Sequence, residues 1–111
     1  MDRVEETLRL IALNDEQSVG SALAVDPGAS NRQGLDPKTR ALIRLGALVS
    51  LGATATSYRW TVEVAYGAGA TDEEVLAVLS AVAPAAGLAR VVSAAPALAL
   101  AMGYDVADDL T

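Results

Sequence analysis

The sequence predicts an all-α protein, folded as a single-domain bundle of about six helices. Apolar residues recur with the spacing of amphipathic helices or fill whole segments. Capping residues and glycines separate these segments from one another. No alternating run of β-branched residues is bounded by turn residues, as a strand would be. The length of 111 residues is typical of one domain.

Residues 1–34 are expected to form an N-terminal helical arm and a loop. Apolar residues recur every three to four positions across residues 2–13, which predicts an amphipathic helix. Asn14 is interpreted as the N-cap of a second, short helix, with Gln17 completing a capping box. Residues 26–34 are rich in Pro, Gly, Ser and Asn and therefore predict a loop.

Residues 35–111 are expected to form the helical core of the same domain. Asp36 is a favourable N-cap, and Pro37 suits the first position of a helix. This helix is apolar on nearly every side to Leu51, which predicts burial on most of its surface. A further helix is expected over residues 55–68.

Two more helices are predicted toward the C-terminus. Thr71 and Glu74 have the spacing of a capping box at the start of one helix. Pro84 and Gly87 are expected to break that helix. The last helix is expected over residues 88–102.

The charge and the motif content exclude several classes of function. The net charge is −6, from eight Lys and Arg against fourteen Asp and Glu, and no basic cluster is present. This argues against nucleic acid and anionic membranes as partners. No apolar signal segment opens the sequence, so we expect a cytoplasmic protein. No metal-ligand spacing or nucleotide-binding motif occurs, so we expect no metal and no cofactor.

The segment from residue 35 to residue 103 resembles the carboxymuconolactone decarboxylase family, which includes the alkylhydroperoxidase D-like proteins. Three features carry the resemblance: the Leu-x-Pro-Lys-Thr-Arg run at residues 35–40, the Ala-x-x-x-Gly-Ala-Thr-x-x-Glu run at residues 65–74, and Ala86-Gly87 before the final helix. The resemblance implies an alkylhydroperoxidase D-like fold and a homo-oligomer, either a trimer or a hexamer.

The resemblance also locates the reactive positions of the family. In the peroxidase branch, two Cys and one His correspond to Thr54, Ser57 and Thr61 of this sequence, and an acidic residue corresponds to Ala41. The chain contains neither Cys nor His. Because peroxide reduction in that branch needs a thiolate and a resolving thiol, we exclude thiol peroxidase activity. The decarboxylase branch needs no Cys pair, although it typically has a His at the position of Thr61.

Arg40 and Arg44 lie four residues apart and share a helix face. They are candidates for binding a carboxylate, or else for ion pairs at a surface or a subunit interface. Arg59 is a third candidate for carboxylate binding. Glu63 follows it by four residues, so Glu63 is either a general acid or base or the partner of Arg59 in a surface salt bridge.

The hydroxyl and aromatic residues of the same segment complete the predicted site. Thr54, Ser57 and Thr61 are expected to donate hydrogen bonds to a ligand, or else to bond within the helix. Tyr58 and Trp60 are expected to form an aromatic wall, or else to pack in the core or an interface. Within this set, Glu63, Tyr58 and Thr61 are the catalytic candidates.

These observations lead to one leading function and one competing class. The first is cofactor-independent decarboxylation or binding of a small organic acid or lactone. The second is a non-catalytic oligomeric scaffold or binding module that has lost the family chemistry. An accessory subunit of a hetero-oligomer is a third reading that one sequence leaves open.

Overall fold

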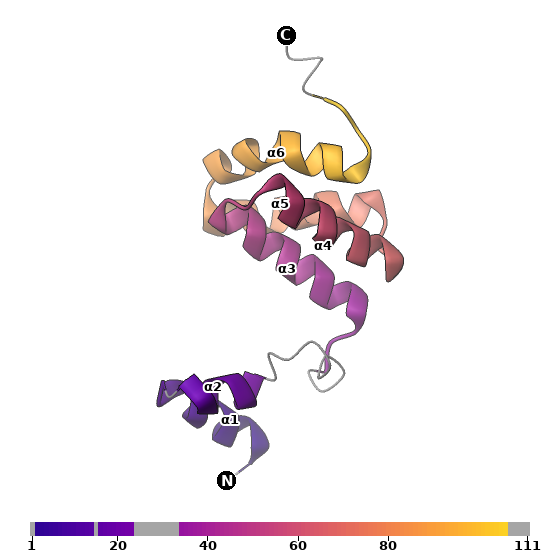
Figure 1. The fold of residues 1–111 in the computed structure, drawn as a ribbon. Coiled ribbons are helices and arrows are strands. Elements are labelled where there is room, and N and C mark those ends of the chain that lie inside the picture. Colours follow the sequence, from indigo (N-terminus) through magenta and orange to yellow (C-terminus); the bar gives the residue numbers. More distant parts are fainter. Residues whose placement is uncertain (1, 15, 24–33, 107–111) are drawn as a thin grey trace. The chain divides into compact units, whose positions relative to one another are not determined.

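Six α-helices make up the ordered elements of the computed structural model, which describes residues 2–14, 16–23 and 34–106 (Figure 1). Within these residues the structure contains no strand, so the predicted all-α fold class is confirmed. The chain divides into two units, Met1–Asp36 and Pro37–Thr111, which are described separately below.

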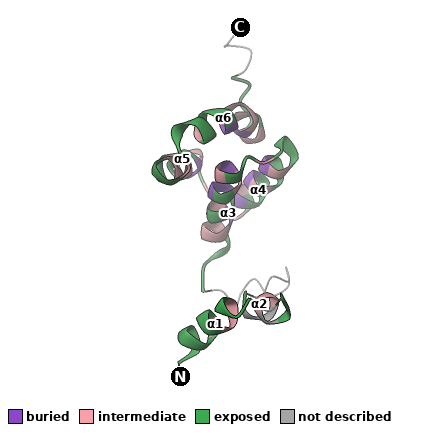
Figure 2. Ribbon diagram, turned by 90° about the vertical axis from the view of Figure 1, so that its left-hand side faces the viewer, coloured by how far each residue is buried: buried purple, intermediate pink, exposed green. Residues whose placement is uncertain are grey.

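The first unit contains two short helices, α1 (Arg3–Ala12) and α2 (Glu16–Leu23). Asp2 caps α1, because its side chain accepts a hydrogen bond of 2.9 Å from the backbone N–H of Glu5. No residue of α1 is buried, and Figure 2 shows the helix mostly in green, the colour of exposed residues. Two residues of its apolar face, Val4 and Leu8, are 69% and 61% exposed.

The second unit contains α3 (Pro37–Leu51), α4 (Ala55–Gly67), α5 (Asp72–Ala86) and α6 (Leu88–Met102). Helix α3 packs against the other three helices, and α6 also packs against α4 and α5. The buried residues of this unit are coloured purple in Figure 2. Seven of them form one core cluster: Leu45, Val49, Tyr58, Val62, Val75, Ala94 and Leu98.

The connection between α4 and α5 follows directly from local sequence. Gly69 adopts a φ of +97°, a backbone conformation that favours glycine. The next residue, Ala70, donates its N–H to the carbonyl of Ala65 at 2.9 Å, which closes a Schellman motif at the end of α4. Thr71 and Glu74 then form the capping box that the sequence predicts for α5.

Two of the predicted helix boundaries are wrong. Asn14 has a φ of +56°, whereas an N-cap residue is extended, so Asn14 follows the end of α1 and does not cap α2. Pro84 does not break its helix, because α5 continues to Ala86 and ends at Gly87. Near a helix end a proline disrupts little, since few further turns depend on the lost backbone hydrogen bond.

Candidate functional site

A hollow between α3 and α4 brings together three of the nine predicted site residues. Arg44, Trp60 and Thr61 line it, and two apolar residues, Ala41 and Val64, complete its wall. Its volume is about 190 Å³. Arg44 comes from the middle of α3, and the other two residues come from consecutive positions of α4.

The lining of this hollow combines one cation, one hydroxyl and one aromatic surface. The Arg44 side chain is exposed and provides planar N–H donors that suit a carboxylate. Thr61 is half-buried and adds a hydroxyl group. Trp60 is 68% exposed, so most of its indole surface remains open to a ligand or to another protein chain. Apolar walls with a few polar groups are typical of small-molecule sites.

Two of the four positions to which the family resemblance points line the hollow. They are Ala41 and Thr61, whereas the other two, Thr54 and Ser57, do not line it. The hollow therefore presents a methyl group and a hydroxyl group at these two positions.

Tyr58 does not line the hollow. It is 1% exposed and belongs to the core cluster of the second unit. Its hydroxyl donates to the carbonyl of Leu48 at 3.4 Å and accepts from the N–H of Ala53 at 3.4 Å. Tyr58 thus connects the last turn of α3 to the segment that leads into α4.

Thr54 and Ser57 lie at the beginning of α4 and bond to each other. The Thr54 hydroxyl accepts from the backbone N–H of Ser57 at 3.2 Å, which caps the helix. It also donates to the hydroxyl oxygen of Ser57 at 3.1 Å. The Thr54 hydroxyl therefore bonds to the first turn of α4, and Thr54 does not line the hollow.

The remaining charged candidates lie outside the lining of the hollow. Arg59 and Glu63 are exposed on α4, and no ion pair joins them in this fully described helix. Arg40 is half-buried one turn before Arg44. Among the described side chains, its Nε is buried without a hydrogen-bond partner. Arg40 therefore has one N–H donor on α3 that no described residue uses. Leaving a buried N–H group without a partner is unfavourable.

A polar cluster that the sequence does not predict lies at the C-terminal end of α4. Two tyrosines donate to one carboxylate: Tyr66 to Oδ1 of Asp72, and Tyr104 to Oδ2 at 2.6 Å. The hydroxyls of Tyr104 and Tyr66 hold the pKa of Asp72 below its usual value. Burial, together with the Asp72 carboxylate, raises the pKa of Tyr66 to about 12.

This cluster joins α4, α5 and the segment after α6. The hydrogen bond to the same carboxylate also raises the pKa of Tyr104. Tyr104 and Asp72 are 32 positions apart in the sequence, so local spacing gives no signal for the contact.

The described residues contain no group of three or more His, Cys, Asp or Glu placed to hold a metal ion. None of the described helices combines the length and the apolar character needed to cross a membrane.

Comparison with known proteins identifies the family of this chain. The model of the carboxymuconolactone decarboxylase family matches residues 22–100, which include all of α3, α4 and α5 and most of α6. No curated protein and no solved structure matches the chain. Since the family match extends over well more than half of the sequence, the chain belongs to the carboxymuconolactone decarboxylase family.

Proposed function

We propose that this chain binds a small organic acid in the hollow between α3 and α4. The observation that carries the proposal is the convergence of Arg44, Thr61 and Trp60 on one hollow in a family of decarboxylases. Arg44 forms charge-assisted hydrogen bonds to the carboxylate of the ligand. Thr61 donates a hydroxyl hydrogen bond, and the indole of Trp60 covers the apolar part.

The size of the hollow limits the ligand. A volume of about 190 Å³ equals roughly six water molecules at their share of liquid volume. A small mono- or dicarboxylic acid or a lactone acid fits this space, whereas a nucleotide does not. The proposal therefore concerns metabolites of few carbon atoms.

Binding has stronger support than catalysis. Loss of CO2 leaves a carbanion that has to be stabilised and then protonated. Arg44 is suited to stabilising the developing negative charge, but Thr61 is the only hydroxyl that lines the hollow and is a weak acid. Glu63 follows Thr61 by two residues and lies on another face of α4. In a decarboxylase form of the proposal, bound water supplies the proton.

The competing proposal is an oligomeric scaffold that has lost the family chemistry. It is favoured by the structural use of two of the predicted site residues, because Thr54 caps α4 and Tyr58 lies in the core. The exposed side chains of Trp60 and Val64 would then pack against another subunit, in a trimer or a hexamer. Both proposals place the protein in the cytoplasm.

A thermal-shift screen of small carboxylates and lactones tests the first proposal. A ligand present at 100 times its Kd stabilises the folded state by about 2.7 kcal/mol. Arg44→Ala is expected to abolish the shift, while Arg59→Ala, an exposed arginine outside the hollow, keeps it. Thr61→Val is expected to weaken it. Release of CO2 from the best ligand distinguishes an enzyme from a binding protein.

If no compound in the panel shifts the melting temperature, the binding proposal fails and the scaffold remains. If Arg59→Ala removes the shift and Arg44→Ala does not, the ligand binds elsewhere on the protein.

A further inference from the structure

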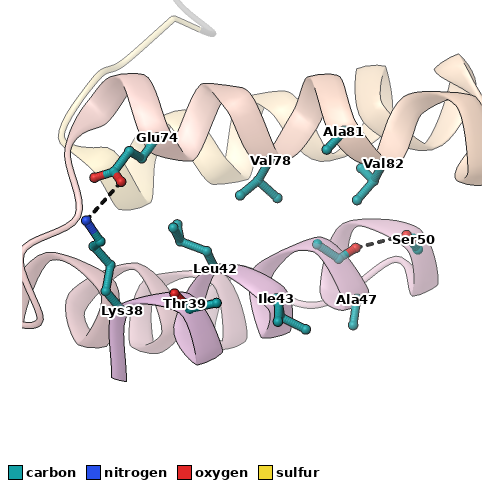
Figure 3. A pocket seen from close by; sticks show the side chains of 11 residues that line it. Lys38, Thr39, Leu42, Ile43, Ala47, Ser50, Glu74, Val78, Ala81 and Val82 are labelled. Atoms are coloured by element: carbon teal, nitrogen blue, oxygen red, sulfur yellow. Dashed lines mark hydrogen bonds and ion pairs between the residues drawn. The ribbon is translucent and has the colours of Figure 1, made fainter. Parts of the chain in front are cut away.

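A second hollow lies between α3 and α5, and none of its lining residues lines the hollow around Arg44. Its volume is about 440 Å³, which lies within the range of roughly 300–1,000 Å³ that is common for small-molecule pockets. We call this hollow the α3–α5 groove. Figure 3 shows the two helices side by side, with Lys38 opposite Glu74 at one end and Ser50 beyond Val82 at the other.

The groove is long because its lining follows the axis of α3. Four of the lining residues of α3 are spaced by four positions and therefore lie on one face of the helix. They are Lys38, Leu42, Gly46 and Ser50. From the first to the last of them the helix extends roughly 18 Å. A linear molecule matches this shape, whereas a wide and rigid one does not.

The middle of the groove is narrow and apolar. A Cβ on Gly46 would lie 3.0 Å from a methyl group of Val82 and 3.4 Å from one of Val78, so the missing side chain permits α3 and α5 to approach closely. Ile43 and Ala81 also line the groove, and both are exposed. Apolar groups of this kind gain free energy when an alkyl chain removes them from water.

The polar groups that a ligand can use lie at one end of the groove. Lys38 and Glu74 form an ion pair, with Nζ 3.0 Å from Oε2, and the side chain of each is 37% exposed. At the other end, the Ser50 hydroxyl donates to the carbonyl of Gly46 at 2.9 Å, so its proton is already used. A molecule with one polar head group therefore finds its polar contacts beside the ion pair.

The ion pair selects the charge of that head group. The bond to Lys38 holds the pKa of Glu74 below its usual value, so Glu74 is ionised at neutral pH and the two charges cancel. A carboxylate placed beside the pair is repelled by Glu74, and an ammonium group is repelled by Lys38. A hydroxyl group is neutral, and it can accept a hydrogen bond from the ammonium and donate one to the carboxylate.

We propose that the α3–α5 groove binds an unbranched aliphatic alcohol of medium chain length. The hydroxyl group of the alcohol lies beside Lys38 and Glu74, and its chain extends between α3 and α5 toward Ser50. This site takes a neutral molecule, whereas the hollow around Arg44 takes an anion. The two sites are therefore tested with different probes and different variants.

Three probes with the same chain test the selection of the head group: 1-octanol, octanoate and octylammonium. Titrations followed by two-dimensional proton–nitrogen NMR spectra at neutral pH give the affinity of each probe and the residues that it contacts. The protein is expected to bind 1-octanol about tenfold more tightly than either charged probe. From 1-butanol to 1-octanol, the affinity is expected to rise by up to about fourfold for each added methylene group.

Substitutions in the ion pair are expected to change the preferred probe in opposite directions. Glu74→Gln removes the anion but keeps a side-chain oxygen that accepts from the N–H of Thr71 in the capping box. This variant is expected to prefer octanoate, because it leaves Lys38 without its carboxylate. Lys38→Met is expected to prefer octylammonium, because Glu74 then lacks its ammonium partner. An apolar surface that binds octyl chains without regard to the head group would not show this exchange.

Two matched substitutions locate the site. Ala81 and Ala77 are both exposed residues of α5, but only Ala81 lines the groove. Ala81→Phe narrows the groove and is expected to weaken the binding of 1-octanol at least about tenfold, whereas Ala77→Phe keeps the affinity of the wild type. Both variants are expected to retain the circular dichroism of the wild type and the response of the hollow around Arg44 to small carboxylates.

Equal binding of the three octyl probes to the wild type overturns the proposal, as does an affinity for 1-octanol that Ala81→Phe leaves unchanged. The same holds if Glu74→Gln and Lys38→Met keep the probe preference of the wild type. Absence of 1-octanol binding also overturns the proposal. If Ala81→Phe then has a lower mass than the wild type in light scattering, a second copy of the chain occupies the groove instead.

Discussion

Replacing Tyr58 with Phe tests whether the Tyr58 hydroxyl has a structural role or a catalytic one. The sequence places Tyr58 among the catalytic candidates, whereas its hydroxyl lies in the core between the carbonyl of Leu48 and the N–H of Ala53. Tyr58→Phe removes only the hydroxyl and keeps the ring, which is 1% exposed. A change in stability can thus be assigned to the two hydrogen bonds.

The expected cost follows from the geometry of these bonds. Both are 3.4 Å long, near the upper limit for a hydrogen bond. The Leu48 carbonyl keeps another donor, the N–H of Gly52 at 2.9 Å. The N–H of half-buried Ala53 loses its partner. We therefore expect Tyr58→Phe to lower the free energy of unfolding by about 1 kcal/mol, and the melting temperature by about 4–8 °C.

Chemical denaturation followed by circular dichroism measures this difference, at one fixed protein concentration because association affects apparent stability. Tyr58→Ala, which also leaves a cavity, is expected to cost about 3–5 kcal/mol. Tyr58→Phe is expected to retain the ligand response of the hollow around Arg44. A variant that is as stable as the wild type but no longer responds to ligand would refute the structural assignment.

Three further substitutions test local features. Asp72→Asn is expected to destabilise the protein at neutral pH. The folded-state pKa of Asp72 lies below 3.8, the ordinary value for an aspartate. The stability advantage of the wild type is therefore present above that ordinary value and is lost as the pH falls through the folded-state pKa, which melting curves at several pH values follow. Thr71→Ala removes the capping box and is expected to cost about 1 kcal/mol in denaturant unfolding. Gly46→Leu is expected to cost about 1–3 kcal/mol by overpacking the α3–α5 contact, and a variant more stable than the wild type would contradict that geometry.

The features that the sequence predicts well are determined by neighbouring residues. The capping box of Thr71 and Glu74 spans three positions, and the role of Gly69 depends on one backbone conformation at the end of α4. Such signals do not require knowledge of the rest of the fold. The same holds for the short motifs that carry the family resemblance.

The assignment of α4 side chains to a common site needed information from other helices. Tyr58 and Trp60 are two positions apart, so they lie on nearly opposite faces of a helix and cannot form one wall. One of them faces the core, and the sequence of α4 does not say which. The positions of α3 and α6 decide it, since they bury Tyr58 and leave Trp60 exposed.

Contacts between residues that are far apart in the sequence also cannot be predicted from neighbouring residues. Arg90 is 39 positions from Leu51, yet its guanidinium donates to the carbonyl of Leu51 at the end of α3. A cation near a helix C-terminus is favourable, because the last carbonyl groups carry partial negative charge. From sequence alone, Arg90 is only an interruption in an apolar segment.

The apolar character of α3 is larger than its own fold requires. Leu45 and Val49 face the core, which accounts for one side of the helix, and Ala41 is buried beside α4. Ile43 remains 56% exposed, although a helix of a monomer usually turns charged or polar residues to solvent. The packing of one chain thus leaves this side of α3 unexplained.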